Sequence, residues 1–260
     1  MKKNILMVAI IATAITIAGG LVFNACRKNV EDAHNIEIEF KKILNDTKPN
    51  RNQDIAFYDN PFNFQGEKHN QLLQMFFDKI YPNVDPTQYA NAFVKMASLN
   101  IDKPDAAAER ILNLLKDIIS KDGYYNPKFM NSLSGITQTE KNIVNAYFEK
   151  MQQISDLNSR IALSKQAEDF IIKEKELSSQ EKANILSTFA IYRYSTYFWN
   201  SKERQTKYLS NCDIADAIGF FIATQTDLLE GTRWEAQDGK DAYAYAGFVS
   251  NTVSFAGGCF

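Results

Sequence analysis

The chain has 260 residues, of which 45% are hydrophobic and 23% are charged. This length corresponds to one large domain or two small ones and is sufficient for an extensive apolar core. Lys and Arg number 29 against 31 Asp and Glu, and this net charge of −2 argues against a nucleic-acid-binding protein. Two His and three Cys are too few for a metal-rich or densely disulfide-bonded protein, so we expect no metal site and no cofactor.

The N-terminus has the features of an export signal. A Met-Lys-Lys start precedes an uncharged, mostly apolar run over 5–22, and the sequence Phe-Asn-Ala then leads into Cys26. This arrangement resembles the lipobox of bacterial lipoproteins, in the relaxed form found in Bacteroidota, where the cysteine carries acyl chains such as palmitate. We therefore expect residues 1–25 to be a lipoprotein signal peptide. Cys26 would anchor an exported protein to the cell envelope, at the outer membrane.

Two other interpretations of the N-terminus remain open. The apolar run of 18 residues would span about 27 Å as a helix, enough for an uncleaved membrane anchor. Ordinary secretion is the other alternative, and all three interpretations export the rest of the chain. Removal of residues 1–25 would change the net charge to −4, because this segment contains two Lys and no acid.

The mature chain is predicted to begin with a tether over 26–60. Apolar residues three and four positions apart could form one short amphipathic helix within it, and a polar stretch without periodicity follows over 45–53. The apolar positions of this helix are Val30, Ala33, Ile36, Phe40, Ile43 and Leu44.

Residues 61–260 are expected to form an all-α domain, a bundle of about seven or eight helices. Asp-Pro at 85–86 and capping boxes at 137–140 and 178–181 mark helix starts. The box at 137–140 opens what we predict to be one long helix reaching Phe170. No segment alternates apolar and polar residues with period two, so we expect little or no sheet.

The C-terminal subregion, residues 210–260, is predicted to be an αα-hairpin rich in small residues. Small side chains recur every fourth position in 213–229 and 240–257, which would let two helices approach closely in a membrane or in a soluble hairpin. Cys212 and Cys259 flank these helices, so we expect them to form a disulfide that closes 47 residues and contributes roughly 4 kcal/mol. Two unpaired buried thiols are the alternative.

Few residues suggest chemistry. His34 and His69 have no metal-ligand spacing and are expected to be solvent-exposed, and no nucleophile elbow or phosphate-binding loop is present. Asp213 and Asp216 share a helical face and could bind a cation or act as a carboxylate pair. Acids favoured by the dipole of a helix's first turn are the commoner explanation. Catalytic residues therefore remain unknown.

An aromatic cluster over 192–199 is the most suggestive surface. Tyr192, Tyr194, Tyr197 and Trp199 could form an exposed face that binds a protein or a glycan, because Tyr and Trp suit half-wet surfaces. The favoured alternative is a helix buried on two sides, with the charge of Arg193 reaching water.

The sequence Tyr-Arg-Tyr-Ser-Thr-Tyr-Phe-Trp at 192–199, followed by Ala-Asp-Ala-Ile-Gly at 215–219, is similar to a group of uncharacterised exported helical lipoproteins of Bacteroidota. The resemblance covers residues 178–258 and implies no activity. We therefore expect a membrane-tethered envelope protein with a binding or structural role rather than an enzyme. Its expected partners are the membrane, through the lipid, and a protein or glycan. The alternatives are a membrane-active or toxin-like hairpin and a hydrolase of envelope or extracellular polymers.

Overall fold

The structure is a computed structural model that describes residues 35–45, 54–80, 83–99, 103–118, 125–133, 135–201, 209–225, 247–249 and 252. This part of the chain is all-α and contains no β-strand, as the absence of period-two patterning predicted. A helix at residues 35–45 comes first. The elements that follow are α2 (Asn63–Lys79), a 3₁₀ turn (Pro86–Gln88), α3 (Tyr89–Met96), α4 (Pro104–Ile118), α5 (Pro127–Ser132), α6 (Gln138–Met151), α7 (Leu157–Lys173), α8 (Ser179–Ser201) and α9 (Leu209–Gln225).

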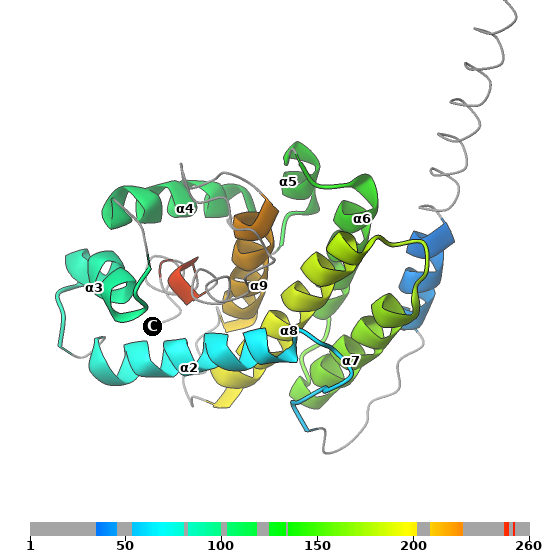
Figure 1. Cartoon of the computed structure of the whole chain (residues 1–260), viewed down its shortest axis with the longest axis horizontal. Helices are drawn as coiled ribbons and strands as arrows, with labels where there is room; N and C mark the ends of the chain where they lie inside the picture. Colours follow the sequence, from blue (N-terminus) through cyan, green and yellow to red (C-terminus); the bar gives the residue numbers. More distant parts are fainter. Residues whose placement is uncertain are drawn as a thin grey trace, which may run out of the picture.

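Helix α8 is the central element of the fold. It packs extensively against α2, α7 and α9, which surround it in Figure 1. Every residue from 184 to 196 is buried, so α8 has no solvent-facing stripe over more than three turns. A helix that is enclosed all round belongs to the core of a bundle, and its polar residues must therefore find partners inside the protein.

Side-chain caps set the starts of several helices. The capping boxes at 137–140 and 178–181 both form, with the serine or threonine and the glutamate each bonding the other's backbone N–H. The prediction of one long helix reaching Phe170 is wrong, because the helix is interrupted at residues 152–156, between α6 and α7. Asp156 there accepts a hydrogen bond from the Ser159 N–H at 2.7 Å and caps a new helix, α7.

The helix at residues 35–45 packs on the body of the protein. Phe40 is fully buried, with its ring 5.6 Å from that of Phe170 and 6.1 Å from that of Phe189. Ile36 and Leu44, one turn to either side, are also buried. The amphipathic helix therefore lies within the predicted tether as a docked element, and the folded body includes residues that we assigned to the tether.

Small residues allow two close helix contacts. A Cβ on Gly66 of α2 would lie 2.5 Å from the Ala190 carbonyl oxygen of α8, so only glycine fits there. Gly219, on the predicted ridge of small residues, would place a Cβ 2.2 Å from Cγ1 of Val249. Residues 247–249 are helical and lie against α9, whereas most of the predicted second hairpin helix falls outside the described residues.

Helix α9 is apolar but enclosed by protein. All its residues from 212 to 222 are buried, and among the helices that the structure describes none is long and apolar enough to cross a membrane. Residues 1–25 lie outside the described part of the chain.

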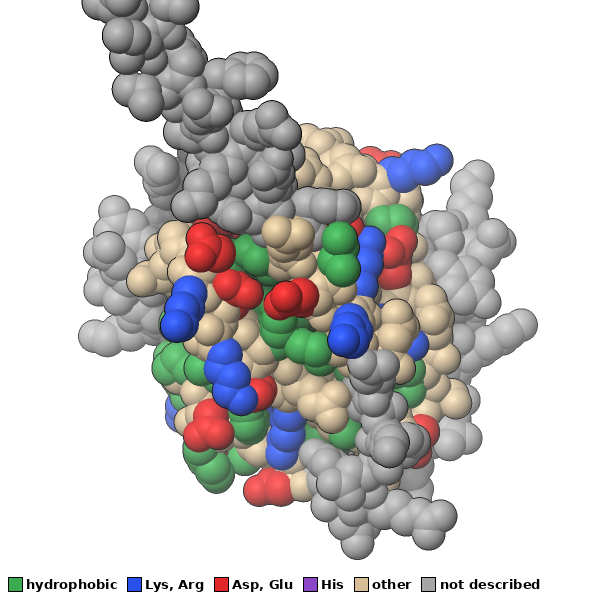
Figure 2. All heavy atoms as spheres, turned by 90° about the vertical axis from the view of Figure 1, so that its right-hand side faces the viewer, with side chains coloured by type: hydrophobic (Ala, Val, Ile, Leu, Met, Phe, Trp, Pro, Cys, Tyr) green, Lys and Arg blue, Asp and Glu red, His purple; other side chains and the backbone are tan. Residues whose placement is uncertain are grey.

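Acidic and basic side chains are interspersed on the side of the molecule where the helix at residues 35–45 lies. Figure 2 shows this face, and its described part gathers no patch of one sign. Two ion pairs between residues four positions apart, Lys41–Glu37 and Lys173–Asp169, have N···O distances of 2.6 Å. Such mixed charge is typical of a solvated surface and creates no concentrated field over it.

Candidate functional site

The middle of α8 carries polar side chains into a core that is otherwise aromatic and aliphatic. Arg193, Ser195 and Thr196 are fully buried. Arg193 reaches α7, whereas Ser195 and Thr196 reach α9. The site therefore consists of two polar clusters that share α8, one centred on Arg193 and the other reaching α9 through Ser195 and Thr196.

The first cluster is built on a buried ion pair. Arg193 donates from Nε to Oε1 of Glu168 at 2.8 Å and from Nη2 to Oε2 at 3.1 Å, and neither side chain is exposed. Burial is the largest single influence and opposes the charge of the guanidinium, but Glu168 together with Tyr194 and Tyr147 outweighs it, so the pKa of Arg193 is raised. The guanidinium also lies 5.2 Å from the ring centroid of Tyr194. Arg193 is thus a buried charge held by α7. The expectation that its charge reaches water is wrong.

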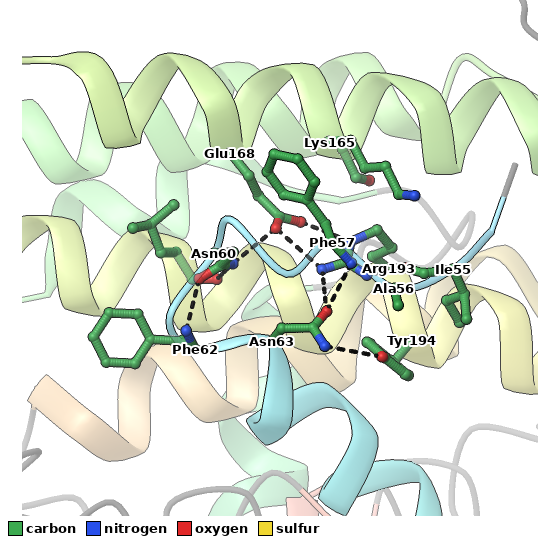
Figure 3. Close-up of polar contacts among 12 residues, drawn as sticks. Ile55, Ala56, Phe57, Asn60, Phe62, Asn63, Lys165, Glu168, Arg193 and Tyr194 are labelled. Carbon is green, nitrogen blue, oxygen red and sulfur yellow. Dashed lines mark hydrogen bonds and ion pairs between the residues drawn. The ribbon is translucent and has the colours of Figure 1, made fainter.

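The same ion pair holds residues 54–63, which we call the strap. Figure 3 shows Asn60 and Asn63 pointing inward from the strap toward Glu168 and Arg193. Asn60 donates from Nδ2 to Glu168 Oε2 at 2.7 Å and to the Leu186 carbonyl at 3.0 Å. Asn63 accepts from Arg193 Nη2 at 3.0 Å through Oδ1. Arg193 Nη1 also donates to the Ile55 carbonyl, so one guanidinium bonds to both ends of the strap.

The second cluster joins α7, α8 and α9 through Asp213. Its Oδ2 accepts from Arg160 Nη1 at 3.0 Å and from Thr196 Oγ1 at 2.6 Å, and its Oδ1 accepts from the Ile214 N–H at 2.8 Å. Burial raises the pKa of Asp213, and Arg160 acts in the opposite direction. The hydroxyl of Tyr192 is buried in the same region, and burial raises its pKa as well.

A serine, an aspartate and a histidine meet beside this cluster. Ser195 Oγ donates to Asp216 Oδ2, Trp199 Nε1 donates to the same oxygen at 3.0 Å, and His69 Nε2 lies 3.8 Å from it. Burial lowers the pKa of His69 to about 4. The imidazole is therefore neutral at pH 7, and its contact with Asp216 is not an ion pair.

The order of these three groups differs from that of a serine hydrolase. In a catalytic triad the imidazole lies between the hydroxyl and the carboxylate, so that it can take the proton of the nucleophile. Here the carboxylate of Asp216 lies between Ser195 and His69, and all three side chains are fully buried. The arrangement joins α8 to α9 through Asp216 Oδ2, with the imidazole of α2 beside it, and it lacks the proton path that activates a serine.

The predicted aromatic face is mostly internal. Tyr192, Tyr194 and Trp199 are buried, and only Tyr197 is exposed, at 46%. Tyr192 packs edge-on against Tyr147 at a centroid distance of 5.3 Å, whereas Trp199 lies against Phe77 of α2 at 5.8 Å. These side chains contribute to the packing of α8, and they do not form one shared surface.

Some of the other predicted site residues lie in the part of the chain that the structure describes, and some lie outside it. Cys212 is fully buried at the start of α9, whereas Cys26 and Cys259 lie outside the described residues, so lipidation and the disulfide stay predictions. His69 was expected to be solvent-exposed and is instead fully buried. Within the described ranges, no group of three or more His, Cys, Asp or Glu side chains could hold a metal ion.

Sequence reasoning missed the residues that complete both clusters, namely Asn60, Asn63, Arg160 and Glu168. Two of them carried a signal: Arg160 and Glu168 fall on the same helical stripe as Ile161, Ala167 and Ile171, all of which are buried. A charged side chain on an apolar stripe requires a partner inside the protein. For Glu168 the sequence offers Arg193, a cation within an aromatic run, as a candidate partner.

Comparisons of the chain with protein-family models, with curated proteins and with solved structures found no match. The similarity of residues 178–258 to exported lipoproteins of Bacteroidota stays a prediction from the residues themselves. The proposals below therefore depend on the N-terminal sequence and on the geometry described above.

Proposed function

We propose that this chain is a lipid-anchored protein of the cell envelope, attached through Cys26 and serving a binding or structural role. The sequence from 1 to 26 carries the proposal: a basic start, an apolar run and an Ala-Cys junction. Two or three acyl chains on one cysteine would hold the protein stably, since each buried CH₂ contributes about 0.8 kcal/mol.

The position of the first docked helix supports this attachment. The helix at residues 35–45 begins nine residues after Cys26, and nine extended residues span at most about 30 Å. A body attached in this way would be held close to the membrane surface. The body would then be positioned to bind the membrane itself or a partner within it.

The environments of the polar side chains support a role other than catalysis. Arg193, Asp213 and Asp216 have the residue types of an active site, but each is buried and bonded to neighbouring helices. Catalytic groups must contact substrate at a cleft and commonly have environments tuned for proton transfer. These polar groups instead specify how α2, α7, α8 and α9 pack together.

The test is lipid attachment in the native host. Cells grown with a radiolabelled or alkyne-tagged fatty acid should yield a labelled protein of mature size that fractionates with membranes. The Cys26→Ala variant should lose the label and accumulate as a longer precursor. Mass spectrometry of the N-terminal peptide should show a diacylglyceryl or triacyl group on Cys26.

Cys212→Ala is the matched control, because it removes a cysteine from the same chain without touching the signal. It should keep both the label and the membrane fraction. Label that persists in Cys26→Ala, or a wild-type protein recovered without lipid, would overturn the proposed anchor.

A further inference from the structure

We propose that the strap (54–63) and the helix at residues 35–45 form a releasable arm, which gives the membrane tether two lengths. The inference rests on the proposed attachment at Cys26. With the arm docked, the body is connected to Cys26 by nine residues, a span of at most about 30 Å. With the arm released, the connection runs to Asn63 at the start of α2. It then has 37 residues and a maximum span of about 130 Å.

The first argument is how the strap is held. Its two buried residues, Asn60 and Asn63, are both polar, and its aromatic side chains Phe57, Tyr58 and Phe62 are half-buried or exposed, Tyr58 by 84%. The strap is thus held mainly by hydrogen bonds: Phe62 packs half-buried against the core, and no apolar side chain of the strap is fully buried. Segments with few buried apolar contacts are the ones that open locally below the free energy of global unfolding.

The second argument is what remains when the strap leaves. Glu168 and Arg193 bond to each other from α7 and α8, so their ion pair does not need the strap. Opening exposes the Asn60 and Asn63 amides, the Ile55 carbonyl and one edge of the ion pair, all of which water can satisfy. The body can therefore stay folded while the strap is open.

The third argument concerns the helix at residues 35–45. It has 11 residues, too few to be stable alone in water, and it buries only Ile36, Phe40 and Leu44 against the body. Its polar contacts are peripheral: Asn142 Nδ2 donates to Glu37 Oε2 at 2.8 Å, and Lys150 Nζ donates to Asn45 Oδ1 at 3.1 Å. This helix depends on docking, and docking depends in part on a short connection to the strap.

The size of that dependence follows from chain length. A closed strap leaves eight residues (46–53) between the end of the helix and Asp54, whose carbonyl accepts from Lys165 Nζ, and an open strap leaves 17 before α2. Doubling a flexible loop weakens its closure about threefold. Opening the strap should therefore loosen the helix by about that factor, while the helices of the body are unaffected.

Hydrogen exchange measured by mass spectrometry on the full lipidated chain in detergent micelles tests the arm. In the wild type, peptides from 35–45 and 54–63 should exchange at least tenfold faster than peptides from α8. The double variant Asn60→Ala/Asn63→Ala should speed exchange in the strap at least tenfold and in the helix at 35–45 about threefold. Exchange in α7 and α8 should not change.

Asn91→Ala is the matched control. Asn91 Nδ2 also makes tertiary hydrogen bonds, to the Asp105 carboxylate at 2.7 and 2.8 Å, but these join α3 to α4. It should leave exchange in the arm at wild-type rates. If the double variant does not fold, Asn63→Ala alone gives the same comparison. The comparison of exchange in the arm with exchange in α8 uses the wild-type protein and needs no variant.

Three results would overturn the two-length tether. The arm could exchange only as fast as α8, the variants could speed exchange equally throughout the chain, or the strap could open while the helix at 35–45 keeps its protection. None of these depends on lipid at Cys26, because the same exchange can be measured on Cys26→Ala. A wild-type protein recovered without lipid would instead overturn the anchor, and the exchange rates would still decide whether the arm is released.

Discussion

Glu168 and Arg193 form a two-point ion pair between α7 and α8, with N···O distances of 2.8 and 3.1 Å and no exposure of either side chain. A buried charge without its partner is far more costly than a buried pair. The pair is also the point where the strap bonds to the body, because Asn60 contacts the carboxylate and Asn63 contacts the guanidinium. One interaction therefore joins two helices and a connecting segment that is more than 100 residues distant in sequence.

Loss of either charge in this pair should destabilise the protein strongly. We expect Arg193→Met to lower the free energy of unfolding by about 3 to 5 kcal/mol, because it leaves Glu168 buried without a cation. Denaturant unfolding followed by circular dichroism measures this. Lys173→Met is the control, since the Lys173–Asp169 pair lies on the surface and such pairs contribute less than about 1 kcal/mol. Equal losses in the two variants would contradict the assignment.

His69 should make the protein less stable in acid. Burial lowers its pKa to about 4 in the folded state, against 6.5 for the free side chain. Between these values the unfolded chain binds a proton that the folded chain does not. The contribution of His69 to stability is therefore complete above pH 6.5 and is lost as the pH falls toward 4, by about 3 kcal/mol in all.

Unfolding free energies measured at several pH values between 7 and 4 check this expectation. His69→Gln removes the titrating group and should flatten the dependence of stability on pH across that window. The comparison uses the difference between the two curves, because burial raises the pKa of Asp213 and this group contributes with the opposite sign. Parallel curves for the variant and the wild type would contradict a buried neutral imidazole.

Two tyrosines of α8 should respond very differently to the same substitution. Tyr192→Ala removes a fully buried ring that contacts Tyr147 and Phe148, and we expect a loss of about 3 to 5 kcal/mol. Tyr197→Ala removes a ring that is 46% exposed and should change stability by no more than about 0.5 kcal/mol. Thermal unfolding of the two variants tests this, and a large effect of Tyr197→Ala would show a packing role that its exposure does not indicate.

The contact between Gly219 and Val249 can be tested by a double-mutant cycle. Gly219→Ala would place a Cβ 2.2 Å from Cγ1 and 2.7 Å from Cβ of Val249, so we expect it to cost about 1 to 3 kcal/mol. Val249→Ala removes both methyl groups, including the Cγ1 of the closest contact, and should relieve part of the clash, since Cβ of residue 249 stays at 2.7 Å. The double variant should therefore lose less stability than the sum of the single variants, by about 1 kcal/mol or more. Strict additivity would mean that the two residues do not touch.

The sequence by itself determined the local features of this protein. Capping residues at 137–140 and 178–181 and apolar spacing of three and four specified an all-α chain, because these signals act within one or two helical turns. Gly219, on the predicted ridge of small residues, lies close to Val249, whereas the packing of two small-residue helices stays a prediction. The same local reasoning failed at Asp156, where a cap inside an apolar pattern divides one expected helix into two.

Only the tertiary structure decided where the polar residues lie. Glu168 meets Arg193 25 residues later, and Asn60 reaches Leu186 across 126 positions, so no local pattern could pair them. His69 and Tyr192 have residue types that suit both surfaces and interiors, and their burial depends on α2 and α9 closing over α8. The physical reason is that capping and helical periodicity are short-range, whereas the burial of a charge is decided by distant parts of the chain that supply its partner and exclude water.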